Sequence, residues 1–247
     1  VKNFVSDQKN QISSSSFIDT INNIRNDYNL ENQFVLMNLL GSHDVERLAS
    51  LIVNPDQWYD HYGNPGQTKT FKVWKPNKLE RAKQRLMIGI QMTMLGAPMI
   101  YYGDEAGMWG GDDPDCRKPM VWNELKYETE VTHPFGLERP SDTVEFDSSL
   151  FNWYKKLISI RKNNKELSRG GLDFIRTNNN TTLSFVRELG ESRINVTINN
   201  SPDYISLPVD KNFTDAFELI SEKYIDRNKK EILFAPYEIK ILKKSRE

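Results

Sequence analysis

The chain has 247 residues, which is long enough for one large domain or two smaller ones with a substantial core. Its 33 lysine and arginine residues nearly balance its 34 aspartate and glutamate residues, so no strong field exists for steering nucleic acid or an anionic membrane. The single cysteine, Cys116, excludes an internal disulfide framework, and no apolar run approaches the roughly 20 residues that span a bilayer. The sequence has no signal peptide and does not begin with methionine, which suggests a fragment or a processed product.

The N-terminal part of the chain alternates helical and strand patterns. In chain order they predict an amphipathic helix over residues 17–28 with its N-cap in the serine run 13–16, a buried strand over 34–40, a helix of about four turns over 79–94 that ends at Gly96, and a second buried strand over 99–102. Both strands are continuous apolar runs, as strands of a parallel sheet are. Strand, helix and strand at this spacing predict a βαβ unit.

A long loop is predicted to follow over residues 107–146, and loops of this length are usually functional or disordered. The two tryptophans in this loop, Trp109 and Trp122, argue against disorder. The next helix should begin at Asp147 or Ser148, either of which can act as the N-cap of an apolar stripe over 150–161.

The character of the sequence changes near residue 165, where short segments of alternating polarity begin. They cover residues 172–176, 183–189, 193–199, 204–207, 217–224, 232–234 and 237–242. Turn-forming residues separate these segments, and the spacing predicts an antiparallel β-sandwich. The domain boundary is expected near residues 163–170, which divides the chain into an α/β part over 1–164 and an all-β part over 165–247.

Polar residues follow both predicted N-terminal strands. His43 and Asp44 come after the first strand, and their spacing supports two readings equally: groups that face a catalytic cleft, or a helix-capping aspartate beside a structural histidine. Asp104 and Glu105 come after the second strand. The simpler interpretation is that both bind backbone amides and neighbouring loops, and the alternative is that Glu105 is an acid or a base.

The loop sequence DDPDCR at residues 112–117 contains three carboxylates but lacks the glycine and the distal glutamate of an EF-hand calcium loop. Asp113 and Arg117 can instead form a charged pair that holds a neutral polyol through several hydrogen bonds; a solvated surface loop is the alternative. Cys116 has no nearby histidine or second cysteine and is interpreted as inert. Scattered histidines and the absence of a phosphate loop predict no metal or other cofactor.

The motif LLGSHD at residues 39–44 resembles the seventh-strand motif of the alpha-amylase family of glycoside hydrolases. The motif GAPMIYYGDE at 96–105 is similar to the eighth-strand motif of that family. The sequence GGDDPDCRKPMVW at 110–122 is similar to its neopullulanase and cyclomaltodextrinase branch. The order and spacing of the three motifs make the resemblance specific, and it extends over the whole chain.

The resemblance implies the last two βα units of a (β/α)8 barrel over residues 1–164, followed by an antiparallel β-sandwich over 165–247. It implies that Asp44 is the carboxylate that stabilises the transition state and that His43 binds the sugar next to the cleavage point. Asp113 and Arg117 would hold a glucose unit further along the cleft. The implied substrates are starch, maltodextrin or cyclodextrin. The implied reaction is hydrolysis of α-1,4 bonds with retention of configuration, and the resemblance does not decide whether α-1,6 bonds are also hydrolysed.

The sequence departs from the family in one important respect. The only Arg-x-Asp sequence lies at residues 25–27; it lacks the glycine of the nucleophile motif and belongs to the first helix, and nothing matches the motif of the general acid. We therefore expect the nucleophile, the acid and the N-terminal part of the barrel to be missing, and the chain to be inactive alone. A non-catalytic amylase-fold subunit and a carbohydrate-binding module are the alternatives.

Further expectations concern partners and surroundings. The unpaired edges of a two-strand remnant favour self-association. An α-glucan or maltooligosaccharide is the expected substrate, with no nucleic acid and no membrane segment. Calcium binding by the complete enzyme is left undecided, because no motif in this chain supports it. The expected location is either the bacterial cytoplasm or the periplasm.

Overall fold

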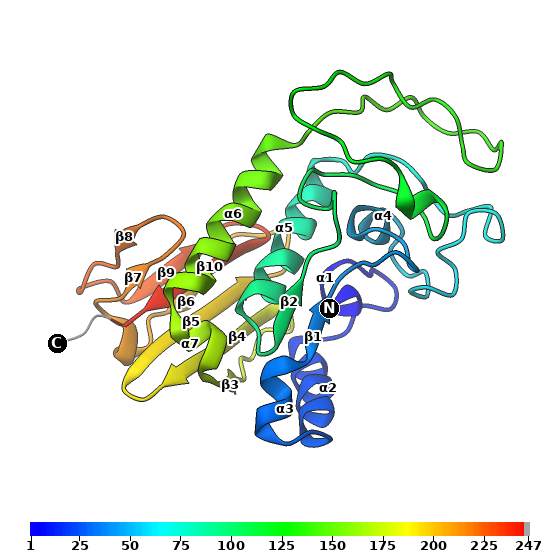
Figure 1. Cartoon of the computed structure of the whole chain (residues 1–247). Helices are drawn as coiled ribbons and strands as arrows, with labels where there is room; N and C mark the ends of the chain where they lie inside the picture. The colour runs from blue at the N-terminus through cyan, green and yellow to red at the C-terminus, as the bar shows by residue number, and fades with distance from the viewer. Residues whose placement is uncertain (245–247) are drawn as a thin grey trace.

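The structure is a computed structural model that describes residues 1–244 (Figure 1), so the last three residues of the predicted range 165–247 lie outside it. The helices and 3-10 turns are α1 (Lys2–Val5), α2 (Ser14–Asn26), α3 (Leu30–Val35), α4 (Leu48–Val53), α5 (Lys78–Thr93), η1 (Asp115–Arg117), α6 (Ser148–Asn163), α7 (Lys165–Arg169) and η2 (Lys211–Phe213). The strands are β1 (Met37–Leu39), β2 (Ala97–Met99), β3 (Gly171–Ile175), β4 (Thr182–Leu189), β5 (Ser192–Asn199), β6 (Ile205–Pro208), β7 (Phe217–Glu218), β8 (Lys223–Tyr224), β9 (Glu231–Phe234) and β10 (Glu238–Lys243). Within residues 1–244, no helix has both the length and the apolar character needed to cross a membrane.

The predicted βαβ unit is confirmed. Strands β1 and β2 pair in parallel, and α5 connects them on one side (Figure 1). Helix α5 begins with a capping box in which Asn77 and Glu80 satisfy each other's backbone amides, which stabilises its first turn. Gly96, two residues beyond the C-cap, has φ +109, and a Cβ there would lie 2.6 Å from the carbonyl oxygen of Leu36. Only glycine therefore allows the chain to turn from α5 into β2 directly beside β1.

The two strands are shorter and more exposed than predicted. The predicted strand over 34–40 was too long at its start, because Phe34 and Val35 form the end of helix α3, whose N-cap Asn29 accepts a hydrogen bond from a first-turn amide. The second strand lies at 97–99 rather than 99–102. Burial was predicted for both strands, yet Met37 is 61% exposed. The reason is that β1 and β2 pair only with each other among the described residues, so their outer edges are uncovered.

Helix α2 confirms the predicted amphipathic helix and its serine N-cap, since the Ser13 side chain accepts a hydrogen bond from the Ser16 amide at 3.1 Å. Phe17 and Ile18 are buried, whereas the end of the same stripe stays exposed. That end lines an apolar cavity of about 240 Å³ between α2, α3, β1 and α5. The uncovered edge of β1 therefore continues into an apolar groove.

The all-β part contains the predicted antiparallel strands. Six of them form a sheet in the order β3-β4-β5-β10-β7-β8, and β6 pairs with β9 in a second sheet. The predicted segment 217–224 is two short paired strands, β7 and β8, rather than one strand. Along β5, Ile194, Val196 and Ile198 are fully buried in the main core with residues of α5 and α6. The opposite face of that sheet contacts a second, smaller apolar cluster around Phe213 and Phe234.

Arg187 is one of several side chains that join the two parts of the chain. Arg187 of β4 is fully buried, and its guanidinium donates to the carbonyl oxygens of Thr93 at 2.7 Å, Leu167 at 2.9 Å, Gly170 at 2.8 Å and Gly171 at 3.0 Å. Burial lowers the pKa of Arg187 to about 9. The main hydrophobic core is also continuous from α1 to β10. The boundary near residues 163–170 stays a prediction.

Candidate active site

His43 and Asp44 lie just beyond β1, at the edge where both parallel strands end. In a parallel α/β barrel this is the edge that carries the catalytic groups. The imidazole Nε2 of His43 lies 3.1 Å from Oδ2 of Asp44, and both side chains are 67% exposed. The pair is therefore accessible to a ligand, and the N-cap of the following helix α4 is Arg47 rather than Asp44.

Arg117 brings the second predicted pair to the same place. Its Nε donates to the His43 carbonyl oxygen at 2.9 Å and lies 2.9 Å from Oδ1 of Asp113, and its Nη2 lies 3.2 Å from Oδ1 of Asp44. The side chain of Cys116 donates to the same His43 carbonyl at 3.3 Å. The four residues proposed from the sequence thus form one network, which we call the rim site. Their roles toward a substrate stay predictions.

A buried charged layer lies beneath the rim site. Arg47 is fully buried, and its Nη1 donates to the Tyr102 carbonyl at 2.6 Å and to Oδ1 of Asp104 at 3.1 Å. The guanidinium also lies 4.7 Å from the Tyr101 ring centroid and 4.8 Å from that of Tyr102. Arg47 therefore fixes the segment after β1 against the segment after β2, and Asp104 binds an arginine rather than backbone amides.

A cavity of about 640 Å³ opens beside this layer. It is lined by Tyr102, Glu105, Met120, Trp122, Asn123, Glu124, Phe146, Ser148, Phe151 and Asn152. Oε2 of Glu105 is buried and has no hydrogen-bond partner among the described residues, and Trp122 is 52% exposed. The hydroxyl of Tyr102 donates to the Lys118 carbonyl at 2.7 Å, next to Arg117. The cavity thus adjoins the loop that carries the rim site and offers aromatic faces together with polar acceptors.

The pKa values of two buried carboxyl groups in this region are strongly shifted. Glu46 is 1% exposed, and burial raises its pKa from 4.5 to about 7, although the Asp60 amide donates to its Oε2 at 3.2 Å. Burial likewise raises the pKa of Asp104 to about 7, against the opposing effect of Arg47. Glu46, which has no paired cation among residues 1–244, therefore holds its proton at a pH where exposed carboxyl groups are ionised.

Glu46→Gln should change how stability depends on pH. The folded state keeps the Glu46 proton between about pH 4.5 and 7, where the unfolded state releases it, so wild-type stability falls as pH rises through this window. Glutamine has no such proton, so relative to wild type the variant should gain roughly 2–4 kcal/mol between acidic and mildly alkaline pH. Urea unfolding at about pH 4.5 and pH 8 measures this difference. Glu191→Gln, at an exposed turn, is the matched control and should show no such gain.

Sequence reasoning missed Arg47 and Glu46 as parts of this region. Their signal was available, since they are charged residues directly ahead of the wholly buried helix α4. Their partners could not be read from the sequence, because Asp104 is 57 positions away from Arg47. Among residues 1–244, no group of three or more histidine, cysteine, aspartate or glutamate residues is arranged to hold a metal ion.

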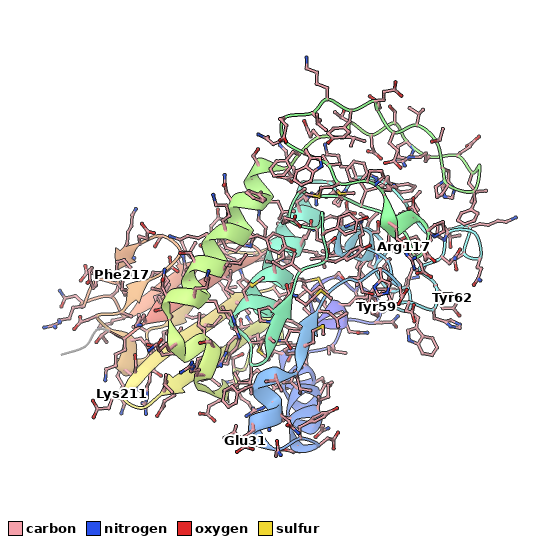
Figure 2. The ribbon with its side chains drawn as sticks, in the orientation of Figure 1. Glu31, Tyr59, Tyr62, Arg117, Lys211 and Phe217 are labelled. Carbon is pink, nitrogen blue, oxygen red and sulfur yellow. The ribbon has the colours of Figure 1, made fainter. Side chains whose placement is uncertain are left out.

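Figure 2 labels Arg117, which lies on the same side of the molecule as Tyr59 and Tyr62 of the preceding loop. The side chain of Tyr59 is partly buried against the main core, and this burial raises its pKa well above the ordinary value. The exposed rings of Trp58 and Tyr62 flank His61. This side of the molecule therefore combines charged groups with aromatic faces, which suits the apolar and polar faces of sugars.

Comparison with known proteins agrees with the strand-end motifs. The profile of the alpha-amylase catalytic domain matches residues 2–170. A cyclomaltodextrinase from Thermoanaerobacter pseudethanolicus is 35% identical over 167 residues, covering 68% of this chain and 21% of that protein. Neopullulanase 2 from Thermoactinomyces vulgaris is 34% identical over 166 residues, covering 67% of this chain and 21% of that protein. The chain spans about a fifth of the length of these curated relatives.

Solved structures show the same fold at lower identity. An alpha-amylase from Anoxybacillus aligns with a TM-score of 0.69 at 17% identity, covering 100% of this chain and 44% of that chain. A cyclic alpha-maltosyl-(1→6)-maltose hydrolase from Arthrobacter globiformis aligns with a TM-score of 0.67 at 18% identity, covering 98% and 42%. The family profile covers more than half of the chain, and the resemblance read from the three motifs is confirmed. This chain belongs to the alpha-amylase family, close to its neopullulanase and cyclomaltodextrinase branch.

Proposed function

We propose that this chain is the C-terminal part of a retaining glycosidase that hydrolyses α-1,4 glucosidic bonds in maltodextrins, starch or cyclodextrins. The observation that carries the proposal is the rim site, where His43, Asp44, Asp113 and Arg117 meet at the C-terminal edge of a parallel strand pair. The names of the two curated relatives agree with α-glucan hydrolysis. Whether α-1,6 bonds are also cleaved belongs to the same proposal and to the same assays.

The rim site suits a supporting role in this chemistry. Retaining glycosidases pass through an oxocarbenium-like transition state, and an ionised carboxylate close to the sugar ring stabilises its positive charge. Asp44 is exposed and is held from one side by His43 and from the other by Arg117, so its position is fixed while an oxygen can face a substrate. Asp113 and Arg117 present a charged fork that can bind sugar hydroxyl groups.

The bond-breaking groups of the proposed reaction lie outside this sequence. Retention requires a nucleophilic carboxylate and a carboxylic acid about 5–5.5 Å apart on either side of the bond. We assign neither role to a residue of this chain. The uncovered edge of β1 and its apolar groove suit a further barrel strand and helix, and they also leave self-association open.

The purified 247-residue chain should therefore release no sugar from maltoheptaose or β-cyclodextrin. Without the nucleophile and the acid, the remaining carboxylate can stabilise charge but cannot form the glycosyl intermediate. A reducing-sugar assay over hours measures this, with a cyclomaltodextrinase in the same buffer as the positive control. Saturable release of glucose or maltose by this chain would contradict the proposed division of roles.

Two other functions are separated by the same experiments. A non-catalytic amylase-fold subunit has no need of the rim site, so the retained network favours the enzyme. A carbohydrate-binding module is usually all-β, whereas this chain contains the parallel β1–β2 unit. Joining the chain to the N-terminal part of a cyclomaltodextrinase barrel should produce hydrolysis if the proposal is right, and binding without turnover if a non-catalytic role is right.

A further inference from the structure

The all-β part contains a cavity of about 640 Å³ between the face of β4 and β5 and the β6–β9 pair. This volume lies within the ~300–1,000 Å³ of small-molecule sites. Lys211 follows Asp210, which lines the cavity, and Figure 2 shows Lys211 on the opposite side of the molecule from Arg117. The cavity, which we call the inter-sheet cavity, is therefore separate from the rim site.

Three polar side chains form the floor of the inter-sheet cavity. Ser184 and Thr197 are directly opposite each other on β4 and β5, and Asn195 lies two residues along the same face. All three are more than nine-tenths buried. A core-facing sheet surface usually carries apolar residues, as the opposite face of β5 does, so three buried polar residues here are a distinct feature.

Every side-chain hydroxyl and amide proton of these three residues is already donated in a hydrogen bond. The Thr197 hydroxyl donates to Oδ1 of Asn195 at 2.9 Å, so the 2.8 Å contact between Ser184 and Thr197 must have Ser184 as its donor. The Asn195 amide donates to Oγ of Ser184 at 3.2 Å and to the Phe185 carbonyl at 3.4 Å. One acceptor position stays open on each of the three oxygens. The floor therefore accepts hydrogen bonds and donates none.

The facing wall is apolar. Leu207, Ile232 and Phe234 of the β6–β9 pair line it together with the buried ring of Phe213. The mouth includes the exposed residues Arg176 and Asp210, which carry opposite charges. Arg176 is itself paired with Asp19. The cavity thus combines a polar accepting floor, an apolar wall and a mouth that carries charges of both signs.

This arrangement selects one class of ligand. An anion finds only acceptors on the floor, and a cation finds no buried carboxylate there, so both are disfavoured. A neutral molecule with several hydroxyl groups and a carbon-hydrogen face satisfies both walls. We infer that the inter-sheet cavity is a second binding site, for a neutral polyhydroxylated ligand of one or two sugar rings. The site is independent of the proposed catalytic role.

The test is a titration of the full 247-residue chain with glucose and maltose, followed by NMR of labelled methyl groups. Saturable shifts are expected at Leu207, Ile232 and Leu242, which line the inter-sheet cavity. Thr197→Val should weaken this binding by about tenfold, because it removes one acceptor at nearly constant volume. Arg117→Ala should leave these shifts unchanged, which distinguishes them from sugar binding at the rim site.

A second pair of variants keeps the test decisive if Thr197→Val unfolds the chain. Ile232→Phe narrows the cavity from the opposite wall without touching the floor and should abolish the saturable shifts at Leu207. Leu233→Phe, the next residue of β9, is 58% exposed and should leave them intact. The inference is overturned if glucose and maltose give no saturable shifts at the cavity methyl groups, or if Ile232→Phe leaves those shifts unchanged. Saturable binding of benzene without sugar binding would also overturn it and show an apolar packing cavity.

Discussion

Arg187→Met should lower the free energy of unfolding of this chain by about 3–5 kcal/mol, the range for breaking a buried charge network. The side chain is fully buried and donates to four carbonyl oxygens, and methionine would leave all of them without that donor. No carboxylate is among those hydrogen-bond partners, so the guanidinium charge is balanced by carbonyl dipoles alone. Urea unfolding followed by circular dichroism and tryptophan fluorescence measures the loss.

Arg193→Met on the neighbouring strand β5 is the matched control. Arg193 is half exposed and pairs with Glu188 at 2.7 Å, so its removal should cost at most about 1 kcal/mol. Arg187→Lys should lie between the two, because a single ammonium group has three donors and cannot reach four spread carbonyl oxygens. If Arg187→Met and Arg193→Met destabilised the chain equally, the role given to Arg187 would be wrong.

In the proposed complete enzyme, Asp44→Asn should lower kcat on the order of 10³-fold, which is about 4 kcal/mol of transition-state stabilisation. The reason is that asparagine keeps the size of Asp44 and one of its two acceptor oxygens but loses the negative charge that stabilises the developing positive charge of the sugar ring. Ground-state binding should change far less. Steady-state kinetics on maltotriose separates the two effects.

Asp113→Asn is the comparison variant for that experiment. Asp113 contacts Arg117 and is proposed to hold a sugar further along the cleft, so its loss should raise KM more than it lowers kcat. The opposite pattern, with kcat unchanged in Asp44→Asn, would remove Asp44 from the reacting centre. An Asp44→Asn enzyme that fails to bind substrate at all would point to a positioning role instead.

Local signals explain what could be predicted from this sequence. The spacing of apolar residues placed α5 within one residue at each end. The predicted serine run 13–16 contains the N-cap of α2, Ser13, and Asp147, one of the two predicted candidates, is the N-cap of α6. The motif LLGSHD located the rim site because the C-terminal ends of parallel strands lie at the same edge of the sheet. The strand predicted over 34–40 began too early because the apolar run was interpreted without weighing Asn29, the N-cap of helix α3, which includes Phe34 and Val35.

Long-range pairing explains the rest. Arg117 meets Asp44 across 73 positions, and Ser184 meets Thr197 only because β4 and β5 pair in one of several registers. The exposure of Met37 could not be foreseen either, since an apolar strand carries no sign of which neighbour covers it. Composition and periodicity describe one element at a time, whereas these features belong to pairs of elements.

Cys116 gives the rim site a chemical reporter of its own. The thiol is completely buried, burial raises its pKa, and it donates to the same His43 carbonyl that Arg117 binds. The loop carrying Arg117 therefore cannot leave His43 without uncovering the only thiol in the chain. The rate at which a thiol reagent modifies Cys116 in the native protein then measures how often that loop opens.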